Sequence, residues 1–355
     1  MNEHKFKYKW NLIDGYPAQG IEKHGLKVFG TFICGGGSTM GYKLAGFEHL
    51  GGVEIDPPIA DVYKTNHNPK YLFIEDIRDF ANRLEFPEEL YNLDILDGSP
   101  PCSSFSMAGN REKDWGKEKV FREGQSLQRL DDLFFDYIKL AKKLQPKVVI
   151  AENVKGMLQG NAKVYVKRIK YEFEQAGYKV QLFLLNAASM GVPQKRERVF
   201  FVCQRNDLNL PKLKLEFNEK SIFFKEFKEI GIGKKISGKM LELWYKKKDN
   251  EKDLAKACER QYNQRAYFGS KIQYDNEIPF TVIASSSSPI IKSDEPLEIS
   301  KNEVCQIGTY LLDYNFKKIE PKYLIGMSVP PVMTAQVAHQ IYLQWLSKTG
   351  LKQGK

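Results

Sequence analysis

The sequence predicts an α/β fold, because short apolar runs alternate with helix-like stretches between Lys27 and Cys203. Apolar runs of about four to six residues, joined through helical patterns, are typical of parallel strands in βαβ units. The clearest helix lies between Leu130 and Gln145, where apolar residues recur every three or four positions, and Pro146 ends it. We therefore expect a mainly parallel sheet built from βαβ units.

Each expected element corresponds to a definite run of residues. The apolar runs are KVFGTFIC (27–34), LGGVEID (50–56), NLDILDGS (92–99), PKVVIAENV (146–154), KVQLFLLNA (179–187) and RVFFVCQ (198–204). The helical stretches are STMGYKLAGFEH (38–49), the segment 130–145 and YVKRIKYEFEQAGY (165–178). A last segment, VMTAQVAHQIYLQWLSK (332–348), has apolar residues at helical spacing and a core-like composition.

The composition argues against several classes of protein. The chain has 355 residues, 42% of them hydrophobic, and no apolar run approaches the roughly 20 residues of a membrane span. The basic N-terminal stretch lacks the apolar core and the cleavage site of a signal peptide. Five cysteines, an odd number without a CxxC pair, argue against a disulfide framework and a zinc site. We expect a soluble, cytoplasmic protein with two domains, or with one domain and a large insertion.

The region from Arg205 to Tyr274 has a looser pattern and a basic character. Between Pro211 and Arg260, 14 Lys and Arg residues stand against 9 Asp and Glu residues, so this stretch carries half of the chain's net charge of +10. One interpretation is a solvated surface on a variable insertion. The other is a face that follows the phosphates of a nucleic acid.

A glycine-rich turn, TFICGGGS (31–38), follows the first expected strand and precedes a helix. Glu54 and Asp76 lie where the second and third strands would end. Glycines let backbone amides approach a bound group at the carboxyl edge of a sheet, and an acid about 20 residues further on commonly binds ribose hydroxyls. The pattern fits NAD, FAD or S-adenosylmethionine equally well, and it also fits a tight turn with a helix cap.

Cys102 has a setting that is unusual for a core cysteine. It follows Pro100 and Pro101 at the end of an expected strand and leads into a polar loop. A reactive thiolate requires a pKa lowered by cations or amides, and the QKRER run (194–198) supplies candidate cations. The charged loop from Ser103 to Gln125 is a candidate lid. The other cysteines are expected to be small buried hydrophobic residues: Cys34, Cys203, Cys258 and Cys305.

Four motifs occur in the order that is found in a known family. They are Pro100-Pro101-Cys102, Ala151-Glu152-Asn153-Val154, the QKRER run (194–198) and GMSVPP (326–331). On these motifs, the sequence resembles the DNA cytosine-5 methyltransferases over nearly the whole chain. The resemblance implies a Rossmann-like, S-adenosylmethionine-dependent methyltransferase core, formed by residues 1–205 and 320–355. It also implies a smaller, mostly irregular or β target-recognition domain, formed with its return segment by residues 206–319.

The resemblance implies S-adenosylmethionine as methyl donor, S-adenosylhomocysteine as product, and no metal. Glu54 would hold the ribose, Ile55 would lie against the adenine, and Asp76 would meet the adenine amino group. The implied cofactor-binding residues are Phe32, Gly36, Gly37, Glu54, Ile55, Asp76, Ile77, Pro100, Leu133, Ser328 and Val329. The chain departs from the family's usual residues at four positions: Gly30, Cys34, Ser103 and Met327. At the second of these positions the family usually has glycine.

The resemblance further implies a covalent mechanism. Cys102 would add to C6 of a flipped-out cytosine, which makes C5 nucleophilic enough to accept a methyl group. Glu152 would hydrogen-bond the N3 and N4 edge of the base, and Arg198 would hold O2. Arg196 would lie close to the thiolate. These four residues form the expected catalytic set.

The expected substrate is duplex DNA, contacted by Ser103, Ser106, Gln194 and Arg265. The RQYNQRAYFG run (260–269) offers further groove contacts at Tyr262, Gln264 and Tyr267, with a packed strand as the alternative. We expect a monomer that acts at the nucleoid, without a membrane, either paired with a restriction endonuclease or solitary. The competing hypotheses are a tRNA cytosine-5 methyltransferase of the same fold, a nicotinamide or flavin oxidoreductase, and a non-catalytic DNA-binding relative.

Overall fold

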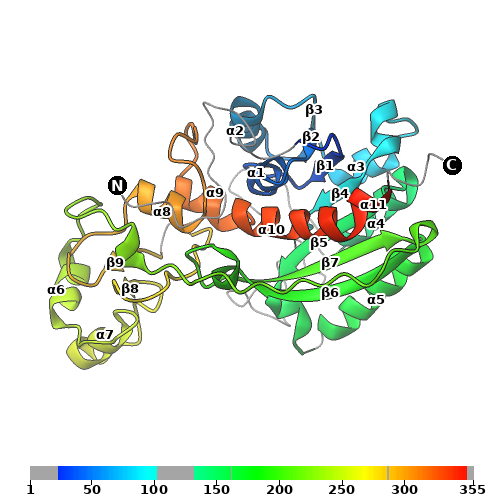
Figure 1. Cartoon of the computed structure of the whole chain (residues 1–355). Coiled ribbons are helices and arrows are strands. Elements are labelled where there is room, and N and C mark those ends of the chain that lie inside the picture. Colours follow the sequence, from blue (N-terminus) through cyan, green and yellow to red (C-terminus); the bar gives the residue numbers. More distant parts are fainter. Residues whose placement is uncertain (1–22, 102–131, 161, 286–287, 350–355) are drawn as a thin grey trace.

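The computed structural model describes residues 23–101, 132–160, 162–285 and 288–349. It has a large body, which holds a seven-stranded sheet, and a small body at the left of Figure 1. The small body contains α6 (Gly238–Lys246), α7 (Ala255–Tyr262), β8 (Lys271–Gln273) and β9 (Ile290–Lys292). The α/β fold predicted from the apolar runs is confirmed.

The seven strands of the sheet lie in the order β3-β2-β1-β4-β5-β7-β6. Their bounds are β1 (Lys27–Thr31), β2 (Glu48–Glu54), β3 (Tyr71–Ile74), β4 (Ile95–Gly98), β5 (Val148–Val154), β6 (Tyr178–Asn186) and β7 (Glu197–Arg205). The first five strands pair in parallel, whereas β7 is antiparallel to both of its neighbours. The order reverses between β1 and β4, and ligands of such sheets bind outside the carboxyl ends of the strands at this point.

Helices cover both faces of this sheet. On one face lie α3 (Ile77–Asn82), α4 (Leu133–Leu144) and α5 (Ala162–Gln175), which share one apolar core with the strands. On the other face α1 (Gly37–Leu44) packs against α10 (Pro331–Ile341), and α2 (Pro57–His67) joins α1 through a further cluster. Figure 1 shows α10 running along the sheet beside α1.

The amphipathic pattern of α4 explains how the first of these faces is covered. Leu133, Phe134, Tyr137, Ile138 and Ala141 recur at helical spacing, and all of them are buried. The Tyr137 hydroxyl donates to the carbonyl oxygens of both Leu96 in β4 and Ile150 in β5. The helix ends at the expected proline, because the residue before Pro146 adopts a left-handed conformation with φ of 48°.

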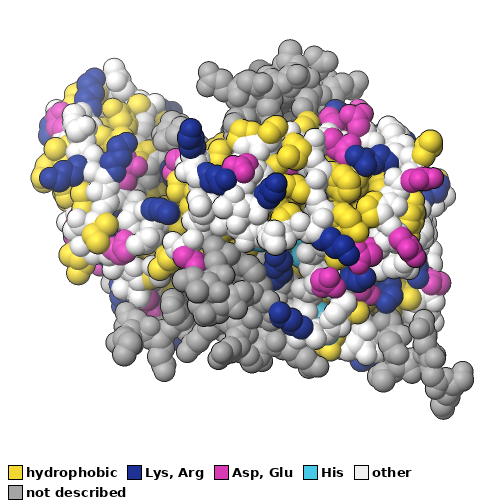
Figure 2. All heavy atoms as spheres, turned by 90° about the horizontal axis from the view of Figure 1, so that it is seen from above, with side chains coloured by type: hydrophobic (Ala, Val, Ile, Leu, Met, Phe, Trp, Pro, Cys, Tyr) yellow, Lys and Arg dark blue, Asp and Glu magenta, His cyan; other side chains and the backbone are white. Residues whose placement is uncertain are grey.

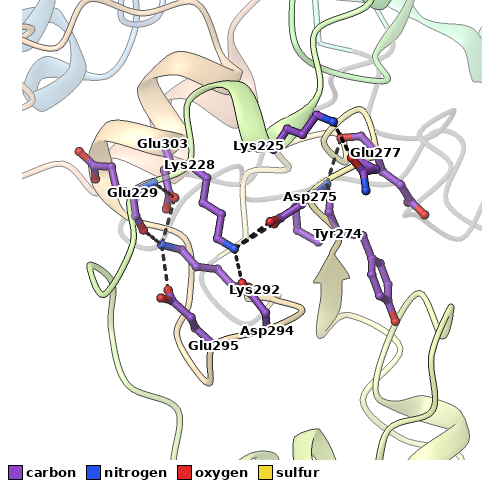
Figure 3. Close-up of polar contacts among 12 residues, drawn as sticks. Lys225, Lys228, Glu229, Tyr274, Asp275, Glu277, Lys292, Asp294, Glu295 and Glu303 are labelled. Carbon is purple, nitrogen blue, oxygen red and sulfur yellow. Dashed lines mark hydrogen bonds and ion pairs between the residues drawn. The ribbon is translucent and has the colours of Figure 1, made fainter. Parts of the chain in front are cut away.

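The small body has its own core, and ion pairs tie it to the segment that leads back to the large body. Lys292 in β9 and Glu303 in α8 (Lys301–Ile307) are both fully buried and lie 3.0 Å apart, Nζ to Oε1. Lys292 also donates to the Ile232 carbonyl at 2.7 Å. Nearby, Lys228 pairs with Asp275 and with Asp294 (Figure 3). These contacts join segments that are far apart in the sequence.

Two segments assigned to the small domain from the sequence pack against the large body. Leu213 and Leu215 belong to the core cluster that contains α10, and the Gln181 side chain in β6 hydrogen-bonds the backbone of Leu213 in both directions. Similarly, α8 packs on α9 (Pro321–Met327) and shares a core cluster with α1 and α2. The small domain is mostly irregular, and it also contains the two helices α6 and α7. The boundaries 206–319 stay a prediction.

Candidate active site

The glycine turn after β1 has a backbone conformation that few side chains tolerate. Phe32, Cys34 and Gly36 all have positive φ, at 53°, 47° and 79°. Residues with a Cβ are strained in this region. Cys34 stands where the family usually has glycine, and its φ explains that preference.

Glu54, at the end of β2, holds this turn in place. Its Oε2 accepts the Cys34 N–H at 2.9 Å, and its Oε1 accepts the Asp56 N–H at the same distance. Burial raises the pKa of Glu54, while these backbone hydrogen bonds oppose the shift. Ile55, the next residue, keeps 39% of its surface exposed. The sheet edge therefore presents an apolar side chain beside a buried carboxyl group.

The glycines of the turn allow close packing against the C-terminal motif. A Cβ on Gly37 would lie 2.4 Å from the Val329 carbonyl oxygen and 2.9 Å from Ser328 Cβ. Ser328 is buried, accepts a hydrogen bond from the Tyr310 hydroxyl at 2.7 Å and donates to the Leu324 carbonyl at 2.9 Å. The fold thus brings together predicted cofactor residues that are almost 300 positions apart.

The remaining predicted cofactor residues lie around the same edge. Asp76 precedes α3 and caps it, accepting the Arg78 N–H at 2.8 Å and pairing with the Arg78 guanidinium at 2.8 Å. Ile77 and Leu133 are buried in one core cluster, against which Phe32 packs. Pro100 is buried as well.

Glu152 in β5 and Arg198 in β7 form a nearly buried ion pair. Arg198 Nε lies 2.7 Å from Glu152 Oε1, and their side chains are 15% and 10% exposed, in the order Arg198 and Glu152. The adjacent strands β5 and β7 place these residues diagonally opposite each other, since Arg198 is in register with Val154. Burial lowers the pKa of Arg198, and Glu152 opposes this shift. A carboxylate held by a guanidinium at a strand end can bind the polar edge of a ring.

Asn153 connects this pair to the segment that precedes Cys102. Its Nδ2 donates to the Pro100 carbonyl at 3.0 Å, and its Oδ1 accepts the N–H of Val154 at 2.9 Å. Because the side chain is buried, the amide has a fixed position between β5 and the loop after β4. Sequence reasoning missed this role of Asn153, although the residue stands in the centre of the Glu-Asn-Val motif. Cys102, Ser103 and Ser106 lie outside the described residues.

Arg196 is buried where the QKRER run meets the return segment. It is 2% exposed, and its Nη atoms donate to the carbonyl oxygens of Val282, Gly326 and Ser328 at 2.9–3.0 Å. Burial lowers its pKa. The guanidinium thus joins the QKRER run to the return segment and to the C-terminal motif. Its terminal nitrogens donate to the backbone, which is a positioning role. The closeness of Arg196 to the thiolate stays a prediction, because Cys102 lies outside the described residues.

Gln194 is buried in the same junction. Its side chain is 1% exposed, with Nε2 donating to the Ile307 carbonyl at 3.0 Å and Oε1 accepting the Val282 N–H at 3.2 Å. We predicted that Gln194 contacts DNA. In this conformation its side chain is not available for that contact, because the fold uses both of its polar atoms.

A match to a family model shows to which protein family this chain belongs. The model described as C-5 cytosine-specific DNA methylase matches residues 26–343, which include both bodies. The chain belongs to this family.

Individual relatives of this methylase family support the assignment. The type II methyltransferase M.FnuDI of Fusobacterium nucleatum is 41% identical over 189 residues, which are 52% of this chain and 48% of that protein. The chain thus spans about half the length of this relative. M1.HphI of Haemophilus parahaemolyticus is 26% identical over 89% of this chain and 86% of its own length. A solved structure of a Spodoptera frugiperda DNMT2 variant has a TM-score of 0.63 at 18% identity, covering 90% of this chain and 100% of that one, and shows the same fold.

The DNA contacts predicted in the small body separate into exposed and packed residues. Arg265 is exposed at 83% of its side chain, and its Nε lies 3.5 Å from Glu259 Oε1. Gln264 is exposed too. By contrast, Tyr262 and Tyr267 pack against the small-body core. The two tyrosines are therefore packed, but not in the strand that we considered as the alternative, because Tyr262 ends α7 and Tyr267 has a positive φ of 66°.

Three of the cysteines expected in the core are buried, and none of the described residues forms a metal site. Cys203, Cys258 and Cys305 are buried and free, whereas Cys34 is half-buried. Burial raises the pKa of the Cys34 thiol to about 12, so this thiol does not compete as a nucleophile. In the described part of the chain, no cluster of His, Cys, Asp and Glu could hold a metal, and no helix is long and apolar enough to cross a membrane.

Proposed function

We propose that this protein is a DNA (cytosine-5-)-methyltransferase that acts on a flipped-out cytosine in a specific duplex sequence. The observation that carries the proposal is the buried pair of Glu152 and Arg198, to which Asn153 links the backbone just before Cys102. Family membership supplies the reaction class, and the pair supplies groups for the polar edge of a pyrimidine. The chain's residues thus match the demands of covalent cytosine chemistry.

S-adenosylmethionine is the proposed methyl donor. The carboxyl edge of the sheet at β1 and β2 suits it, since Glu54 offers a carboxyl group, Ile55 offers an exposed apolar side chain, and Gly37 leaves space only for backbone. When bound, the sulfonium supplies an electrophilic methyl group. The proposed binding residues remain the predicted set: Phe32, Gly36, Gly37, Glu54, Ile55, Asp76, Ile77, Pro100, Leu133, Ser328 and Val329.

In the proposed mechanism, the Cys102 thiolate forms a bond to C6 of cytosine and makes C5 nucleophilic. Arg198 holds Glu152 in place, and Glu152 stabilises the proton at N3 and binds the N4 amino group. Once C5 has taken the methyl group that S-adenosylmethionine would supply, with S-adenosylhomocysteine as the product, a base removes the C5 proton. This re-forms the C5–C6 double bond and expels the Cys102 thiolate, and the proton at N3 returns to Glu152. Arg196 contributes by fixing the backbone of the motif that carries Arg198. The target base must leave the stack for this, at a cost of a few kcal/mol.

The proposed substrate is duplex DNA, read by the small body through Arg265, with Ser103 and Ser106 at the catalytic loop. The similarity to type II methyltransferases supports a place in a restriction-modification system, paired with a restriction endonuclease. We further propose that the protein is a monomer whose site of action is the cytoplasmic nucleoid, because its DNA substrate lies there. The tRNA alternative has no observation in its favour.

Transfer of a labelled methyl group tests the proposal. Purified protein and labelled S-adenosylmethionine are incubated with mixed-sequence duplex DNA and, separately, with total tRNA. We expect label in the DNA at C5 of cytosine, none in the tRNA, and none with Cys102→Ser. Label in tRNA alone would establish the alternative substrate, and a folded wild-type protein that labels neither would refute the enzyme assignment.

A further inference from the structure

A pocket lies at the junction of the two bodies and is lined by side chains from both. Its volume is about 260 Å³. Lys195 enters it from the segment before β7, Lys271 from the first position of β8, and Lys322 from the first turn of α9. Thr281 and Ser288 contribute hydroxyl groups to the wall. Among the described residues that line this pocket, none is acidic.

The backbone fixes the direction in which Lys195 points. The N–H of Lys195 donates to the Pro279 carbonyl at 3.0 Å, and its own carbonyl accepts the Thr281 hydroxyl. Its neighbours Gln194 and Arg196 are buried in the junction, whereas the Lys195 side chain is exposed. Consecutive residues of an extended segment point to opposite sides, so Lys195 faces the pocket while its neighbours face the core.

The positive charge of the pocket is only partly compensated. Lys271 pairs with Asp253 at 3.0 Å, and Lys322 Nζ donates to the Ser288 carbonyl. Neither Lys195 nor Lys322 forms an ion pair with a carboxylate of the described residues. Burial lowers the pKa of Lys322 by penalising its charged form, while the carboxylates of Glu320 and Glu298 oppose this shift. A bound anion would remove that penalty.

We propose that this pocket binds one backbone phosphate of the substrate DNA, an inference that rests on the proposed function. Lysine contacts phosphate as a point charge, and the Thr281 hydroxyl helps indirectly, because it donates to the Lys195 carbonyl and so holds Lys195 at the wall. These groups come from separate segments that converge on one small space, as a single anionic group requires.

The position of the pocket links phosphate binding to catalysis. Arg196 Nη1 donates to the Val282 carbonyl, and the residues on either side of it, Thr281 and Ile283, line the pocket. Gly269, which ends the exposed run that contains Arg265, lines it too, and a Cβ there would lie 3.0 Å from Ser288 Oγ. A phosphate held here sets the register of the DNA between the small body and the catalytic pair.

The salt dependence of DNA binding tests this assignment. Affinity of the full-length protein for a fluorescein-labelled duplex of mixed sequence is measured by anisotropy at several salt concentrations. Removing one lysine–phosphate interaction lowers the magnitude of the slope of log K against log salt concentration by about 0.9. Between 1 M and 0.15 M salt, the variant should therefore gain about fivefold less affinity for the duplex than the wild type gains. We expect this change for Lys195→Gln and for Lys322→Gln, with little further change in the double variant. Lys167→Gln, an exposed lysine of α5, is the matched control and should keep the wild-type slope.

Several outcomes separate this inference from the proposed function. A wild-type slope in folded Lys195→Gln, whose exposed side chain is not part of the core, would overturn the phosphate pocket alone. Wild-type protein that binds no duplex at any salt concentration would overturn the DNA substrate itself. If adenosine monophosphate binds as tightly as the duplex does and displaces it, the pocket would be assigned to a free nucleotide. Unchanged S-adenosylmethionine binding in the variants, with the shallower slope, supports the pocket.

Discussion

The large body and the small body fix their polar groups by different means. In the large body, the buried Arg196 guanidinium donates to three backbone carbonyls, and a seven-stranded sheet orients Glu152 and Arg198. In the small body, the sheet has two strands of three residues each, and a fully buried pair, Lys292 and Glu303, ties its strand β9 to α8 of the return segment. Charge pairs there replace the backbone ladder that a larger sheet provides.

This difference indicates which parts of the molecule tolerate amino-acid substitutions. The proposed catalytic residues Glu152 and Arg198 depend on the register of long strands, which few substitutions can alter without destroying the site. The small body depends on a few buried pairs, while its outer surface is free to vary. Figure 2, which shows the molecule from above, has Lys and Arg side chains scattered singly over the small body rather than gathered into one stripe. The hypothesis of a solvated variable surface therefore fits this face.

Breaking the proposed catalytic pair of Glu152 and Arg198 should have the largest effect, which is on the rate of methyl transfer. Glu152→Gln should lower the single-turnover rate of methyl transfer by about 10²- to 10⁴-fold, because the proton at N3 is no longer stabilised. S-adenosylmethionine binding should be unchanged. Glu197→Gln is the matched control, since Glu197 pairs with Lys155 at a site where both side chains are 39% exposed. Equal rates for the two variants would refute the catalytic role of Glu152.

The second prediction breaks the small body instead. Lys292→Met should lower the free energy of unfolding by about 3–5 kcal/mol, because Glu303 is left buried and unpaired. Urea unfolding measures this, and Lys246→Met, at an exposed pair with Glu242, should cost at most about 1 kcal/mol. Combining Lys292→Met with Glu303→Gln, which removes the stranded charge and keeps an acceptor for the N–H of Glu229, should recover most of the stability. No recovery would show that packing, rather than the stranded charge, causes the effect.

The third prediction concerns the pH dependence of stability in the large body. Burial raises the pKa of Asp97 to about 7, although the Tyr42 hydroxyl donates to this carboxyl group. The folded state therefore binds the proton more tightly than the unfolded state does, so Asp97 lowers stability as the pH rises from about 4 to 7. Asp97→Asn should remove up to about 4 kcal/mol of this dependence. A wild-type profile in urea titrations of the variant would contradict this.

The smallest expected effect is at Cys34. Its φ of 47° disfavours any residue with a Cβ, so Cys34→Gly should raise the free energy of unfolding by about 0.5–1 kcal/mol after the entropy of glycine is included. Cys34→Ala retains the Cβ and serves as the control without this relief. Thermal unfolding of both variants checks the difference, and equal midpoints would mean that backbone strain is negligible here.

Local patterns predicted most of the large body. Apolar runs indicated the strands, the helical spacing indicated α4, and the glycine turn correctly pointed to a sheet edge near Glu54. These features depend on neighbours within one element or on consecutive elements, which is why a single sequence can specify them. The ion pair of Glu152 and Arg198 was not predicted as such, although both residues were placed in the catalytic set.

Sequence patterns failed where the partner of a residue is distant. A run such as QKRER is typical of a surface, yet Arg196 is buried, because its acceptors lie 86, 130 and 132 residues further along the chain. Gln194 is buried for the same reason, with partners at Ile307 and Val282. Contacts between residues so far apart in the sequence can be recognised only once the return segment is placed beside β7.

Trapping of the covalent intermediate tests the central claim most directly. Bisulfite sequencing of DNA from cells that express the chain first identifies the methylated site. A duplex carrying 5-fluorocytosine at that position is then incubated with the protein and S-adenosylmethionine, because fluorine at C5 cannot leave as a proton. We predict a complex that survives denaturing electrophoresis and whose peptide map places the bond at Cys102. Methylation of the natural site without any such adduct, or undiminished turnover by Cys102→Ser, would contradict the account.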